Sequence, residues 1–165
     1  MTIIVAVDPG KSGAIACLVD GRPVIVEDMP ADGKEVCPVR VTSILHDMGP
    51  DAIALEQVGA RPNDRSAQRS FNFGVSFGIL RGICEPTWPT TRVRPTTWRR
   101  HHGLPSRIES GLPEREWKDL SRLLALDLYP HLDTRLARKK DVDRAEACLI
   151  GQWLHDTQHN QQETA

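Results

Sequence analysis

The feature that most constrains this chain is an apolar run that ends in an acid: residues 3–8 read IIVAVD, and Pro9-Gly10 follows at once. β-Branched residues bounded by a Pro-Gly turn are typical of a strand that is buried on both faces. A second such run, residues 51–56 (DAIALE), also ends in an acid. An acid at the end of a buried strand is either a turn residue or a reactive group. We interpret Asp8 as a reactive group.

The order of the predicted elements indicates the fold class. Strands are predicted at 2–8, 13–19, 23–27, 51–56 and 90–93, with an Asp20-Gly21 hairpin turn after the second. Helices are predicted at 39–48, 66–84, 95–102, 114–128 and from 143 to about 155, and loops at 29–38, 59–64 and 103–113. This order predicts an α/β domain with a mixed five-stranded central sheet, antiparallel first and parallel afterwards, flanked by helices.

Length and composition suit one domain. The 165 residues predict a single domain over 1–155 and a polar C-terminal tail at 156–165. No apolar run reaches the length of a membrane span and no signal peptide is recognisable, so we expect no membrane partner. The four cysteines are scattered without a Cys-x-x-Cys pair, which argues against a disulfide framework or a zinc cluster and indicates a cytoplasmic protein.

The two strand-end acids are expected to lie side by side. The strand period of two places Asp8 on the same face as Ala6, and Glu56 on the same face as Ala54. These small residues leave room above that face. If the two strands are parallel neighbours, both acids emerge at the carboxyl edge of the sheet, where ligand sites of open α/β sheets gather.

The last predicted helix adds two more acids. Asp143 and Glu146 are three residues apart and share a helix face that continues through Ile150 and Trp153. This pattern predicts a helix that packs on the sheet with its first turn over the site. The alternative is that acids in a first turn complement the helix dipole, with Asp143 as a cap.

A cluster of four carboxylates predicts a bound cation. Without a Lys or Arg nearby, the acids at 8, 56, 143 and 146 would repel one another strongly. Hard oxygen ligands select Mg²⁺ or Mn²⁺ over Zn²⁺. Two such ions about 4 Å apart are a known arrangement for in-line phosphodiester cleavage, so we expect two per site.

The residue patterns of two further helices predict how these helices pack. Gly74, Gly78 and Gly82 recur every four residues on one face of the helix at 66–84, which indicates close packing on the sheet or on a second subunit. In the helix at 114–128 the apolar period predicts an inward and an outward set. The inward set is Trp117, Leu120, Leu123, Leu124 and Leu128, and the outward set is Lys118, Ser121 and Arg122.

Several segments together resemble a known family. VDPG at 7–10, LEQV at 55–58 and DRAEA at 143–147 are similar to the three signatures of RuvC-type Holliday junction resolvases, within the ribonuclease H-like superfamily. SFNFG at 70–74, PTTWR at 95–99 and KKD at 139–141, ahead of RAEA, resemble the bacteriophage branch. The similarity runs from residue 3 to about 154.

The resemblance implies a ribonuclease H-like fold and a homodimer that binds four-way DNA junctions. It also implies paired symmetric nicks made with Mg²⁺ or Mn²⁺, no organic cofactor, and a place in the cytoplasm of a bacterial host cell. The implied metal ligands and catalytic residues are Asp8, Glu56, Asp143 and Glu146, with Asp141 as the substitute for Asp143.

Two positions depart from the family pattern. The last ligand is Glu146, where cellular members have Asp. In cellular members an aromatic residue that contacts DNA bases follows Glu-Gln-Val, whereas this sequence has Gly59 at that position. Phe71 or Phe73 is a possible substitute, and at this spacing each is also a candidate core residue.

The predicted DNA contacts come from two basic segments and one helix. Cationic residues cluster at 92–100 and 135–140, as phosphate binding requires. Trp98 either stacks on a base or is buried, and Arg99 and Lys118 match basic positions in the family. The predicted DNA-binding residues are Arg94, Trp98, Arg99, Arg100, Lys118, Lys139 and Lys140. Recognition of junction shape rather than of base sequence is expected.

Three alternatives remain open. One is a ribonuclease H-like nuclease that cuts flaps, bubbles or hybrids. The second is a non-catalytic DNA-binding module. The third is half of a sugar-kinase or actin-like ATPase, because DPGKS at 8–12 resembles a phosphate loop, although 165 residues hold only one of the two domains that such an enzyme requires.

Overall fold

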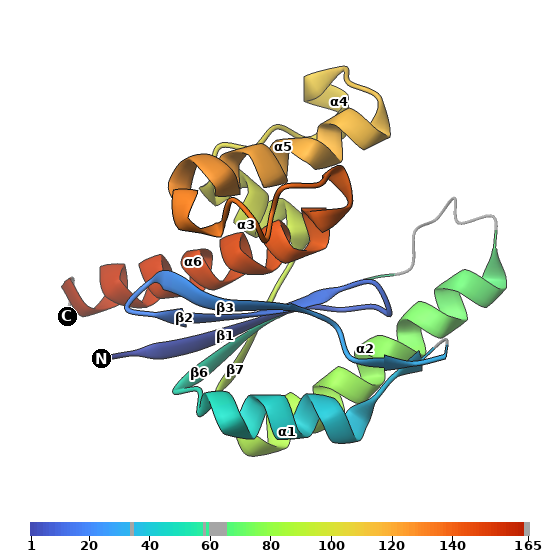
Figure 1. The fold of residues 1–165 in the computed structure, drawn as a ribbon, viewed down its shortest axis with the longest axis vertical. Coiled ribbons are helices and arrows are strands. Elements are labelled where there is room, and N and C mark those ends of the chain that lie inside the picture. Colours follow the sequence, from blue (N-terminus) through green and yellow to red (C-terminus); the bar gives the residue numbers. More distant parts are fainter. Residues whose placement is uncertain (34, 58, 60–65, 164–165) are drawn as a thin grey trace.

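The centre of the molecule is a five-stranded mixed sheet (Figure 1). The computed structural model describes residues 1–33, 35–57, 59 and 66–163. The strand order is β3-β2-β1-β6-β7, with β1 at Ile3–Asp8, β2 at Ala14–Val19, β3 at Arg22–Asp28, β6 at Ala52–Glu56 and β7 at Thr90–Val93. The first three strands form an antiparallel meander, whereas β6 pairs in parallel with β1 and with β7. The predicted sheet is confirmed.

Helices cover both faces of the sheet (Figure 1). On one side lie α1 at Pro38–Met48 and α2 at Ala67–Thr87. On the other lie α3 at Pro95–His101, α4 at Arg107–Ser110, α5 at Glu114–Leu128 and α6 at Val142–Glu163. Two short 3₁₀ turns, η1 at Pro130–Leu132 and η2 at Lys139–Asp141, connect α5 to α6. No helix within the described ranges combines the length and the apolarity that a membrane span requires.

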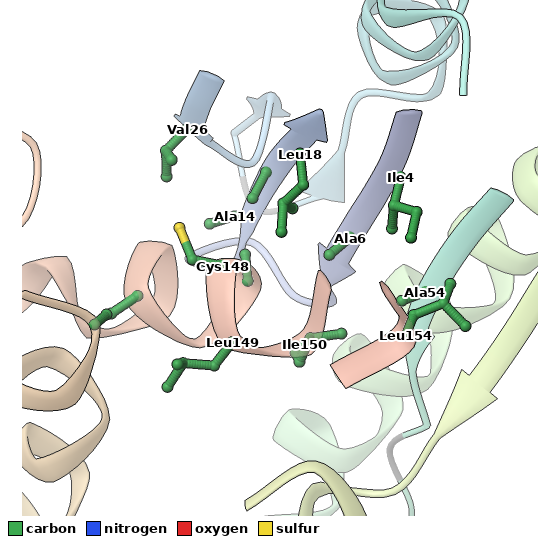
Figure 2. Packing of buried hydrophobic residues seen from close by; sticks show 14 of the residues in the cluster. Ile4, Ala6, Ala14, Leu18, Val26, Ala54, Cys148, Leu149, Ile150 and Leu154 are labelled. Carbon is green, nitrogen blue, oxygen red and sulfur yellow. The ribbon is translucent and has the colours of Figure 1, made fainter. Parts of the chain in front are cut away.

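Alternation along the strands divides the core in two. Val5, Val7 and Leu55 face α1 and α2, whereas Ala6 and Ala54 face α6. Figure 2 shows the second layer, where side chains of α6 approach the strands. Its labelled residues are Ile4, Ala6, Ala14, Leu18, Val26, Ala54, Cys148, Leu149, Ile150 and Leu154. All four cysteines are buried free thiols.

A glycine brings α6 close to the sheet. A Cβ atom placed on Gly151 would lie 2.3 Å from Leu18 Cδ1 and 3.3 Å from Ala6 Cβ. A larger residue at this position would therefore push the helix away from the strands. Because α6 carries Asp143 and Glu146 in its first turns, this contact also sets how near those acids come to the strand ends.

Three segments differ from the sequence-based expectation. The predicted loop at 29–38 contains a two-stranded ribbon, β4 at Ala31–Asp32 and β5 at Glu35–Val36. The predicted loop at 103–113 contains α4, because Ser106 and Glu109 form a capping box that stabilises one helical turn. The last helix continues to Glu163 rather than ending near residue 155. The loop predicted at 59–64 lies, apart from Gly59, outside the described residues.

The predicted faces of α5 are partly wrong. Leu123 and Leu128 are about half exposed, although both were expected inside, whereas Ser121 and Arg122 are buried. Arg122 is held by Asp119, with an Nε–Oδ1 distance of 2.6 Å, so its charge is paired inside the protein. Polar partners therefore override the apolar period in this helix.

The glycine stripe of α2 does not pack against any other part of the chain that the structure describes. Gly74, Gly78 and Gly82 are exposed, and a Cβ atom on any of them would meet no other described part of the chain within 4 Å. Packing on the chain's own sheet, one of the two explanations for the stripe, is therefore excluded. A second subunit remains the explanation to test.

Candidate active site

Two buried acids stand at the ends of neighbouring parallel strands. Val7 of β1 pairs with Leu55 of β6, so the next residue on each strand, Asp8 and Glu56, continues the same register. Their exposed fractions are only 7% and 8%. The predicted placement of both acids at one edge of the sheet is therefore confirmed.

The first turns of α6 bring the second pair of acids to the first. Side-chain oxygen atoms of Asp8, Asp143 and Glu146 lie within 4.8 Å of one another. These three residues and Glu56 line the same open pocket of about 240 Å³. The structure thus brings together the four acids that the sequence predicts, from three separate elements.

Asp141, the proposed substitute for Asp143, does not belong to this cluster. Its side chain accepts hydrogen bonds from the backbone N–H and the guanidinium of Arg138, at 2.9–3.2 Å, and lies 3.8 Å from Arg144. Burial opposes its ionisation, but these bonds lower the pKa of Asp141 below its ordinary value. Asp141 therefore caps the turn before α6, and Asp143 is the residue that faces the pocket.

Trp98 contacts a site acid rather than solvent. Its side chain is 1% exposed, and its indole Nε1 donates a hydrogen bond of 2.8 Å to Oε1 of Glu56. The prediction that Trp98 contacts DNA is wrong for this reason, because a buried ring cannot stack on a base. The sequence contained no signal for this bond, which joins residues 42 positions apart.

Arg99 is also an internal residue. It is 5% exposed, and its Nη1 donates to Oε1 of Glu146 at 3.0 Å and to Oγ of Ser121 at 2.8 Å. Its guanidinium carbon lies 4.1 Å from the ring centre of Trp117. The side chain is directed to a carboxylate, and it also lines the pocket that holds the acids, so its contact with DNA stays a prediction.

The acid cluster thus contains its own cations. Arg99 pairs with Glu146, and Lys118 lowers the pKa of Asp8, Asp143 and Glu146 in opposition to burial. The acids therefore do have a Lys and an Arg nearby, contrary to the condition under which their repulsion was inferred. Nε and Nη2 of Arg99 are buried without a partner among the described residues. An unpaired buried donor costs about 1–3 kcal/mol, so stability alone does not account for this arrangement.

Even with these cations, the acids resist ionisation. Burial, followed by the charges of Glu56, Glu146 and Asp143, raises the pKa of Asp8 well above its ordinary value. Burial also raises the pKa of Glu56 to about 7, although the hydrogen bond from Trp98 opposes this shift. Mutual repulsion of buried carboxylates is what a bound cation relieves.

The donor set fits a hard divalent cation. The three clustered ligand groups are all carboxylates, within 4.8 Å of one another, and no sulfur or nitrogen ligand belongs to the group. Such sets bind Mg²⁺ or Mn²⁺ in preference to Zn²⁺. Glu56 lies at the same pocket but outside the group of three.

The remaining predicted DNA contacts lie at the surface. The exposed residues are Arg94, Arg100, Lys118, Lys139 and Lys140. Lys118 also lines the pocket, next to the acids. Their contact with DNA stays a prediction, because exposure permits phosphate binding without requiring it.

Phe71 and Phe73 are not core residues. Phe71 is 67% exposed and Phe73 is 39% exposed, at the start of α2. Phe73 lines the pocket that holds the acids. An aromatic side chain therefore lies at the site, and its substitution for the aromatic missing at Gly59 stays a prediction.

Fold and site together define a class: an α/β protein with the ribonuclease H-like fold, whose acids gather at the strand ends and at the last helix. Among solved structures, Thermus thermophilus RuvC in complex with a Holliday junction substrate matches at 16% identity and a TM-score of 0.59, over 92% of this chain and 91% of that chain. A second structure of Thermus thermophilus RuvC matches at 17% identity and a TM-score of 0.59, over 92% of each chain. The chain therefore has the RuvC fold. No protein-family model and no curated protein matches the sequence.

Proposed function

We propose that this protein is a metal-dependent endonuclease that resolves four-way DNA junctions by paired symmetric nicks. One observation carries the proposal: four acids from β1, β6 and α6 converge on one pocket, within a fold shared with a protein solved on a Holliday junction substrate. A non-catalytic DNA-binding module would have no use for buried acids whose pKa values are raised by mutual repulsion.

In this proposal Asp8, Asp143, Glu146 and Glu56 hold Mg²⁺ or Mn²⁺, as one or two ions. When bound, the metal supplies Lewis-acid activation of water and neutralises charge on the phosphate. The chain's own contribution is to hold the carboxylates in place on two rigid strands and one helix. Lys118, exposed at the pocket, is positioned to bind a phosphate oxygen.

Cleavage of a panel of nucleic-acid substrates with different structures tests which one the protein cuts. The panel contains a four-way junction, a flap, a bubble, an RNA–DNA hybrid and a linear duplex, each with Mg²⁺ or Mn²⁺. We expect paired nicks in the four-way junction and none in the duplex. Equal cleavage of the linear duplex would exclude a resolvase, and preference for flaps or hybrids would select the alternative nuclease. Asp8→Asn is the inactive control, and it should still bind the junction in a gel shift.

Paired nicks require two active sites, so we further propose a homodimer. The exposed glycine stripe at 74, 78 and 82 of α2 supports it, because glycines let a second helix approach closely and no described residue of the chain covers them. We expect Gly78→Arg to convert a dimer to a monomer in sedimentation while the fold is retained. Val24→Arg, at a 52% exposed position of the edge strand β3, adds the same charge elsewhere on the surface and is the control. A parent that is monomeric at micromolar concentration would refute this part.

A further inference from the structure

Helix α3 delivers two consecutive side chains to two different site acids. Trp98 Nε1 donates to Oε1 of Glu56 at 2.8 Å, and Arg99 Nη1 donates to Oε1 of Glu146 at 3.0 Å. Ser121 Oγ, from α5, donates to the same Oε1 of Glu146 at 2.9 Å. Neither acid lies in α3 or α5, so these contacts depend on the tertiary fold.

The hydrogen bonds leave one oxygen of each carboxylate available. They engage Oε1 of both Glu56 and Glu146, and Oε2 of neither accepts a hydrogen bond from a residue that the structure describes. Both acids line the pocket. A carboxylate with one oxygen fixed is oriented, and its second oxygen stays free to bind a cation.

The donors are themselves held in place. Trp98 is 1% exposed and Ser121 is fully buried. Arg99 lies against the rings of Trp117, at 4.1 Å, and Trp98, at 5.3 Å, measured from its guanidinium carbon to the ring centres. Donors packed in this way cannot follow a glutamate side chain that rotates, so they restrict its rotamers.

We propose that Trp98 and Ser121 are positioning residues for metal binding. Each fixes one oxygen of a long glutamate side chain, Trp98 for Glu56 and Ser121, together with Arg99, for Glu146. Glutamate has one more rotatable bond than aspartate, so the two glutamates are the ligands that most require such support. This inference rests on the proposed metal-dependent function.

The test uses the two neutral donors, because their replacement changes orientation without changing the charge of the site. We expect Trp98→Phe to weaken Mn²⁺ binding to the DNA-free protein about tenfold, by calorimetry, and to alter the Mn²⁺ electron paramagnetic resonance spectrum. Ser121→Ala is the second variant, with the same expected direction. Trp88→Phe, on the opposite side of the sheet, is the matched control and should bind like the parent.

Melting curves in EDTA establish that each variant folds. If Trp98→Phe does not fold, Ser121→Ala alone tests the inference. An unchanged Mn²⁺ affinity and spectrum in the folded variants would overturn the inference, as would a parent that binds no Mn²⁺. Junction cleavage by the parent is measured separately. Weaker Mn²⁺ binding in the variants, with no cleavage by the parent, would support the positioning role and refute the proposed nuclease.

Discussion

Replacing Glu56 by glutamine is expected to stabilise the metal-free protein while removing the proposed nuclease activity. Glu56 is 8% exposed, and its pKa is raised from 4.5 to about 7 by burial first and then by the charges of Glu146 and Asp143. Glutamine has nearly the same shape and no charge. Its carbonyl oxygen still accepts the hydrogen bond that Trp98 donates to Oε1.

The size of the effect follows from the pKa of Glu56. Below pH 4.5 the group is protonated in both the folded and unfolded chain, so its ionisation costs nothing. Above pH 7 it is ionised in both, and the cost in the folded state is complete. A shift from 4.5 to about 7 corresponds to about 3 kcal/mol of unfolding free energy. Glu56→Gln should therefore exceed the parent in stability by up to that amount at pH 8, and by nearly nothing below pH 4.5.

The assay is urea unfolding in EDTA at several pH values between 4 and 8, for the parent and Glu56→Gln. Glu27→Gln, at an exposed glutamate of β3, is the control and should show no such pH-dependent difference. Addition of Mn²⁺ at pH 8 should stabilise the parent and leave Glu56→Gln nearly unchanged. A variant that is no more stable than the parent at pH 8, or a difference that does not vary with pH, would refute the reasoning.

Three further predictions follow from the site. Asp143→Asn should abolish Mn²⁺ binding measured by calorimetry. Asp141→Asn should bind Mn²⁺ like the parent but lose about 2 kcal/mol of unfolding free energy in urea, because Asp141 caps the turn before α6. Mn²⁺ at 100 times its dissociation constant should stabilise the parent by about 2.7 kcal/mol at pH 8 in thermal unfolding, and by less at pH 5, where protons compete for Asp8 and Glu56. Lys118→Met should weaken junction binding in gel shifts and reduce its salt dependence; unchanged binding would remove Lys118 from the interface.

Local sequence patterns were sufficient to predict the sheet and the strand-end acids. The strand period of two placed Asp8 and Glu56 on the face of Ala6 and Ala54, and the order of elements predicted the parallel pairing that makes them neighbours. The helix period similarly placed Asp143 and Glu146 together. These predictions succeeded because each depends on the backbone geometry of one element and on the order of elements.

Predictions failed where a polar side chain has a partner far along the chain. Trp98 was a candidate for stacking on DNA and Ser121 was expected in solvent, but the fold buries both against the acids at 56 and 146. An apolar period cannot identify a buried polar residue, because that residue is stabilised by a donor or acceptor from another element.

The sequence by itself therefore predicted which acids gather at the site and at which edge of the sheet they lie. The structure also distinguishes Asp141 from Asp143. Asp141 is held by Arg138, three residues before it, whereas Asp143 lines the pocket with Asp8 and Glu56, which only the tertiary fold brings to it. It also showed that the site contains its own cations and its own hydrogen-bond donors. The physical reason is that a buried charge requires partners, and residues distant in sequence supply them only after the chain has folded.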